Sequence, residues 1–70
     1  MKPTHYQITV HGRLSATLTA AFDGMTARPS AAGTVLYGEI ADQSALFGVL
    51  ERIESLGLEL VDVRRVARAT

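Results

Sequence analysis

The segment from residue 42 to residue 57 limits the fold most, because its apolar residues recur three and four positions apart, the spacing of one face of an α-helix. These apolar residues are Leu46, Val49, Leu50, Ile53 and Leu56. Asp42 stands where an N-cap side chain accepts backbone N–H bonds, and Gly57 stands where helices commonly end in the left-handed conformation. The segment therefore predicts an amphipathic helix whose apolar face must be covered by the rest of a 70-residue chain.

Strands are predicted on both sides of this helix. Residues 6–10 alternate apolar and polar side chains, as a strand with one covered face does. Residues 25–28 and 34–40 flank a Pro-Ser-Ala-Ala-Gly turn, which is typical of a hairpin. Residues 58–63 are rich in Leu and Val and predict the last strand.

Residues 14–22 fit two structures. Ser15 is a suitable N-cap for a short helix, and Gly24 is a suitable residue just after its end. Thr17 and Thr19, however, alternate with apolar neighbours and equally fit a strand. The sequence leaves this choice open.

The helical alternative gives the order strand, helix, strand, strand, helix, strand. We then expect one α+β domain over residues 1–70 with the ferredoxin-like split βαββαβ arrangement, a four-stranded antiparallel sheet with two helices on one face. The first and third strands would lie side by side in the centre. The strand alternative gives a βββαβ meander with one helix.

Charge and hydropathy exclude several partners. Seven Lys and Arg residues balance seven Asp and Glu residues, so the chain lacks the positive field that nucleic-acid binding needs. No apolar run approaches the roughly 18 residues of a membrane span, and the first residues lack the apolar core of a signal peptide. We therefore expect a cytoplasmic chain with neither a nucleic-acid nor a membrane partner.

Neither a cofactor nor a metal ion is expected. The chain has no cysteine, and His5 and His11 would lie about 20 Å apart along an extended strand. The acidic residues are scattered singly, which does not favour acid–base catalysis. The alternative is an enzyme built between subunits, in which His5 or His11 acts with Glu39. We expect no catalytic residue and interpret the chain as a binding or accessory module.

Two loops suggest a site for a small anionic metabolite. If the first and third strands run parallel side by side, the loops that follow them meet at one edge of the sheet. Two helix N-termini would then bind an anion together with Arg13, Ser15, Asp42 and Gln43. The alternative is that Ser15 and Asp42 only cap their own helices and that Arg13 pairs with Asp42.

Apolar side chains on both faces of the later strands predict self-association. Val35 and Tyr37 alternate with Leu36, and Val61 and Val63 alternate with the leucines before them. The last strand would also be an apolar sheet edge, and 47% of the residues are hydrophobic. We expect a homodimer or higher homo-oligomer that pairs sheet faces or edge strands. The alternative is an adaptor that binds another protein through the open sheet face.

Residues 42–63 resemble the βαβ half of ACT-type regulatory domains, in which an acidic residue opens a helix, a glycine ends it and an apolar strand follows. Through Gly12-Arg13-Leu14-Ser15 the chain is also similar to short uncharacterised actinobacterial proteins. The ACT resemblance implies a ferredoxin-like fold and binding of an amino acid. ACT domains carry their ligand loop after the first strand, whereas the acidic loop here follows the third.

Overall fold

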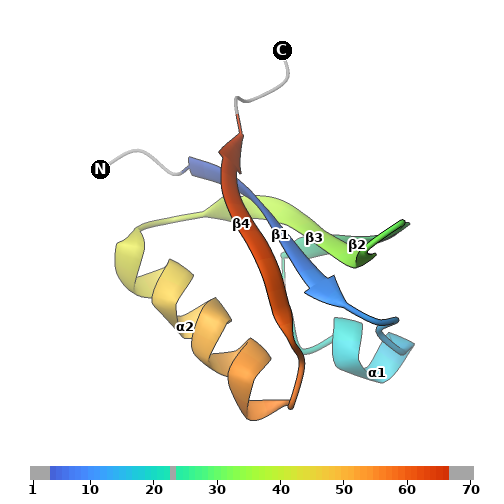
Figure 1. Cartoon of the computed structure of the whole chain (residues 1–70). Helices are drawn as coiled ribbons and strands as arrows, with labels where there is room; N and C mark the ends of the chain where they lie inside the picture. The colour runs from blue at the N-terminus through green and yellow to red at the C-terminus, as the bar shows by residue number, and fades with distance from the viewer. Residues whose placement is uncertain (1–3, 23, 67–70) are drawn as a thin grey trace.

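The computed structural model of the chain describes residues 4–22 and 24–66. It is an α+β structure with four strands and two helices (Figure 1). The elements in chain order are β1 (Thr4–His11), α1 (Ala16–Thr19), β2 (Met25–Ser30), β3 (Gly33–Ile40), α2 (Gln43–Ser55) and β4 (Leu60–Val66). The open choice at residues 14–22 is settled as a helix, so the meander alternative is wrong.

The four strands form one sheet in the order β2-β3-β1-β4. Each neighbouring pair is antiparallel: β2 with β3, β3 with β1, and β1 with β4. The strands β1 and β3 occupy the centre, as the sequence predicts, and β3 lies between β1 and β2. The anion site predicted from the sequence required β1 and β3 to run parallel. They run antiparallel, because the hairpin from β2 to β3 reverses the chain before β3 begins.

One face of the sheet carries the core, and we call it the covered face. Ile8 in β1 lies opposite Leu36 in β3 and Val63 in β4. The side chains of Ile8 and Leu36 are fully buried, in one cluster with Phe22 from the segment after α1 and Ile53 from α2. Because side chains alternate along a strand, the residues between these face the other way, on what we call the open face.

The helix α2 begins and ends as its sequence predicts. The Asp42 carboxylate accepts a hydrogen bond from the Ala45 backbone N–H at 2.8 Å, and Gly57 has a φ of +75°. At the other end, the Leu58 N–H donates to the Ile53 carbonyl and the Gly57 N–H donates to the Glu54 carbonyl. This pair of bonds is a Schellman motif, which uses Leu58 to end the helix. The strand β4 consequently starts at Leu60 rather than at the predicted residue 58.

The Asp42 cap gives a test of this local structure. We expect Asp42→Ala to lower the free energy of unfolding by about 1 kcal/mol, because the Ala45 N–H of the first turn then loses its partner. Gln43→Ala, one position further on, is the matched control and should change stability much less. Urea unfolding of the three proteins measures the difference. Equal midpoints for Asp42→Ala and the unaltered chain would show that this cap contributes nothing.

Candidate functional site

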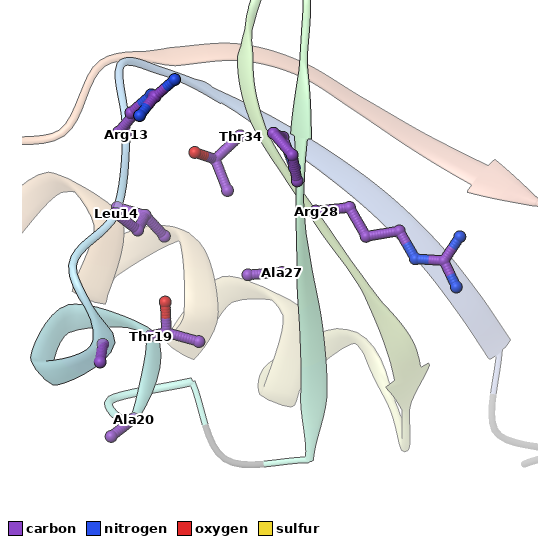
Figure 2. A pocket seen from close by; sticks show the side chains of 9 residues that line it. Arg13, Leu14, Thr19, Ala20, Ala27, Arg28 and Thr34 are labelled. Carbon is purple, nitrogen blue, oxygen red and sulfur yellow. The ribbon is translucent and has the colours of Figure 1, made fainter.

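A hollow of about 570 Å³ lies between the loop after β1, α1 and β2. Figure 2 shows Arg13 and Leu14 on the loop side of the hollow, Ala27 of β2 facing them, and Thr34 of β3 between the two. Most of the lining is small and apolar. The apolar lining residues are Leu14, Ala16, Ala20, Ala27 and Pro29.

The hollow exists because α1 is too short to fill the space above β2. Its single turn, Ala16–Thr19, ends at the C-cap Ala20, and none of its residues is buried. The strand β2 presents small side chains to this space, because Ala27 and Pro29 pair with residues of β3 whose side chains lie on the covered face. A one-turn helix and a strand of small residues therefore leave a cavity where a longer helix would pack.

The polar groups of the hollow are few. The Thr34 hydroxyl donates a 2.8 Å hydrogen bond to the Gly12 carbonyl, and Thr34 is buried. This bond fixes the loop that carries Arg13, whose own side chain is exposed at the rim. Arg28 also borders the hollow, but its side chain runs away from the other labelled residues (Figure 2). Arg13 is thus the cation placed to meet a ligand in this hollow.

The predicted meeting of two helix N-termini is wrong. The β1–β3 register pairs His11 with Gly33 and Thr4 with Ile40, so the loop after β1 and the loop after β3 lie at opposite ends of the sheet. Arg13 can therefore neither share a ligand with Asp42 nor pair with it. The physical reason is the antiparallel direction of the two central strands.

Ser15, Asp42 and Gln43 have local roles. The Ser15 hydroxyl accepts a hydrogen bond from the Leu18 N–H at 3.2 Å, so Ser15 caps α1 as Asp42 caps α2. Gln43 and Asp42 border a separate hollow of about 270 Å³ beside Arg65 of β4. Of the four predicted ligand residues, the structure keeps only Arg13 at the 570 Å³ hollow.

The four predicted interface residues do not form one surface. Val35 and Tyr37 lie on the open face, whereas Val63 lies opposite Ile8 on the covered face and packs against the core. A register shift between Thr9 and Val10 of β1 interrupts the alternation of β4 next to Val61, which is 50% exposed. The alternation assumed for residues 58–63 is therefore broken, and Val61 and Val63 do not continue the surface of Val35 and Tyr37.

The open face is also more polar than the sequence suggested. Val35 and Tyr37 are only partly exposed and share this face with charged side chains. Across the strands these include Arg28, Glu39, Asp62 and Arg64. Glu39 lies directly opposite His5, whose ring centroid is 5.9 Å from that of Tyr37. Glu39 is exposed, so within one chain the pair does not lie in a dry cleft of the kind in which a carboxylate and an imidazole exchange protons with a substrate.

No cluster of three or more His, Cys, Asp or Glu side chains that could hold a metal ion occurs among residues 4–22 and 24–66. Within the same residues, no helix is long and apolar enough to cross a membrane. The hollow beside α1 and the exposed apolar residues of α2 and β4 are features through which the chain could bind a ligand or another chain.

Sequence reasoning missed the hollow. The signal was the row of small residues in and around the first helix, together with Ala27 and Pro29 in the strand that follows. Small residues on both sides of a contact leave space unless a longer side chain reaches across. That signal becomes useful only once the helix is known to be a single turn.

A family model described as a domain of unknown function (DUF8691) matches residues 5–64, which run from β1 into β4 and include both described helices. No curated protein and no solved structure matches the chain.

Proposed function

The chain belongs to the DUF8691 family, and we propose that it acts as a small, self-associating, non-catalytic binding module. Its ligand is a small monoanion with an apolar body, such as a short-chain monocarboxylate. The hollow beside α1 supports this proposal, because it combines a mainly apolar lining with one guanidinium group at its rim.

Size and chemistry define the ligand class. A volume of about 570 Å³ falls within the range of roughly 300–1,000 Å³ that small-molecule sites occupy. The apolar lining disfavours ligands with several charges, because each charge would lose its water without a partner. Arg13 offers a planar fork of N–H donors that suits one carboxylate at the rim.

We also propose that the fold is the ferredoxin-like split βαββαβ arrangement. The position of β3 between β1 and β2 supports this, as do the helices that follow β1 and β3. The relation to ACT-type domains remains a proposal that rests on residues 42–63. A ligand in the hollow beside α1 would contact the loop after the first strand, and ACT domains carry their ligand loop at the same place in the chain.

Thermal unfolding with hexanoate tests the ligand proposal. At a concentration about tenfold above the dissociation constant, hexanoate should stabilise the chain by about 1.4 kcal/mol and raise Tm by about 5–10 °C. Hexanol lacks the charge and inorganic phosphate lacks the apolar body, so each should give a much smaller rise.

Arg13→Ala should weaken hexanoate binding at least about tenfold, because a charge-assisted hydrogen bond contributes about 1.5–3 kcal/mol. Arg28→Ala is the matched control, since it removes the same group from the border of the hollow at a position where the side chain points away (Figure 2). Equal Tm rises in both variants and the unaltered chain would refute the role of Arg13.

Self-association, the other part of the proposal, is supported by exposed apolar side chains on α2 and β4. Phe47 is 57% exposed, and Leu60 and Val61 of β4 are 43% and 50% exposed. Large apolar side chains at this level of exposure are typical of contacts with another chain when they lie near one another.

A further inference from the structure

The sheet has two outer strands, and they differ in their capacity to accept a further strand. The strand β2 contains Pro29, which has no backbone N–H and so interrupts any ladder of hydrogen bonds along that edge. The strand β4, Leu60–Val66, is seven residues long and has no proline. From Asp62 onward, past the register shift beside Val61, its outer edge therefore presents a continuous row of backbone donors and acceptors.

We propose that β4 pairs antiparallel with β4 of a second copy of this chain, about a two-fold axis that passes beside Val63. This inference rests on the self-association proposed above and names its surface. In this register Asp62 lies opposite Arg64 of the second copy, and Arg64 lies opposite the second copy's Asp62. Val63 lies opposite Val63 of the second copy, so an apolar pair forms at the axis itself.

Charge complementarity selects this register. Asp62 and Arg64 both lie on the open face, where their side chains are 43% and 63% exposed and form an ion pair at 3.3 Å. A two-fold axis beside Asp62 would place two carboxylates opposite each other, and an axis beside Arg64 would place two guanidinium groups opposite each other. Like charges directly opposite one another destabilise a strand pair. An axis beside Val63 instead converts both charges into cross-strand pairs.

The position of Phe47 agrees with a partner at this edge. Gln43 and Leu46 of α2 border the same small hollow as Arg65 of β4, so this side of the helix faces the β4 edge. Phe47 lies four residues after Gln43 and hence on the same side. The two-fold axis places both copies of α2 on the covered side of one continuous eight-stranded sheet. Phe47 then points toward the second copy, which explains why a large apolar side chain is exposed there.

Charge reversal at the two positions tests the pairing by sedimentation velocity. The unaltered chain should pass from 7.5 kDa toward twice that mass between about 1 μM and about 1 mM. Asp62→Arg and Arg64→Asp should each raise the dissociation constant of the dimer at least about tenfold, because each places like charges in both cross-strand pairs. Arg28→Asp on β2 is the matched control and should leave the constant unchanged.

Mixing the two variants gives the decisive result. One chain then carries Arg at both positions and the other carries Asp at both, so both cross-strand pairs become favourable in a mixed dimer. We expect the equimolar mixture, and likewise the double variant Asp62→Arg/Arg64→Asp, to recover the dimer. Recovery also shows that the single variants are folded, which circular dichroism of each checks directly.

Two outcomes would overturn the inference and are distinguishable. A chain that stays at 7.5 kDa at every concentration refutes self-association altogether, together with the β4 pairing. A dimer that forms equally well with Asp62→Arg or Arg64→Asp, or a mixture that recovers nothing, refutes this edge and register while self-association stands. Neither outcome bears on the hexanoate experiment, which tests the hollow separately.

Discussion

Gly33→Ala is expected to remove a large part of the stability of the protein. Gly33 has a φ of +144°, a backbone conformation that residues other than glycine rarely adopt. A Cβ at this position would overlap the Val10 carbonyl oxygen and lie 2.6 Å from the Gly12 nitrogen. Both neighbours are backbone atoms at the end of the β1–β3 pair, where His11 lies opposite Gly33, so they cannot move aside without distorting that end of the two central strands.

The expected loss from Gly33→Ala is roughly 3 kcal/mol or more, the sum of backbone strain and steric overlap. A 70-residue domain has a total stability of only about 4–10 kcal/mol, so this loss removes much of it. Gly48→Ala is the matched control: it makes the same change in α2, where no atom lies within 4 Å of the added Cβ. It should stabilise the helix by about 0.5–1 kcal/mol. Urea unfolding that found Gly33→Ala as stable as Gly48→Ala would contradict the close approach at Gly33.

Ile8→Ala has the second large effect. Ile8 is fully buried in the central strand, between Leu36 and Val63, and belongs to the same apolar cluster as Ile53 of α2. Removing its side chain beyond Cβ leaves a cavity in the middle of the core and should cost about 2–5 kcal/mol. Tm should then fall by at least about 10 °C.

The control for Ile8→Ala is Leu56→Ala, which removes a side chain of the same volume from the end of α2. Leu56 is 38% exposed, so its replacement should cost distinctly less than that of Ile8. Thermal unfolding followed by circular dichroism compares the two. A fall in Tm for Ile8→Ala no greater than that for Leu56→Ala would mean that the core does not centre on β1.

The sequence predicts those elements whose signals are local. The cap at Asp42 and the stop at Gly57 determine α2 to within a residue, because both act through bonds inside the helix. The alternation in residues 6–10 locates β1, although the strand itself runs from Thr4 to His11. The observed boundaries of two strands differ from the predicted ones. Pro29 lies inside β2, which an edge strand allows, and Leu58 ends α2 instead of beginning β4.

The candidate site was less predictable, because its parts depend on contacts between distant segments. The expected anion site required β1 and β3 to run parallel, and their antiparallel register separates Arg13 from Asp42. The irregularity in β4 that breaks the alternation around Val61 carries no local marker such as glycine. The hollow depends on the length of α1, which the alternation of Thr17 and Thr19 left undetermined. Pairing direction, register and helix length are decided by tertiary packing, and each of them changed the predicted site.

The most direct test of the binding-module account is a hexanoate titration followed by two-dimensional NMR of the isotope-labelled chain. The account predicts saturable shifts of the amide signals of Arg13, Leu14, Ala27 and Thr34, all of which border the hollow. Asp42 and Gln43, at the opposite end of the sheet, should not move. Shifts that centre on Asp42 and Gln43, or no saturable shifts at the hollow, would contradict the account.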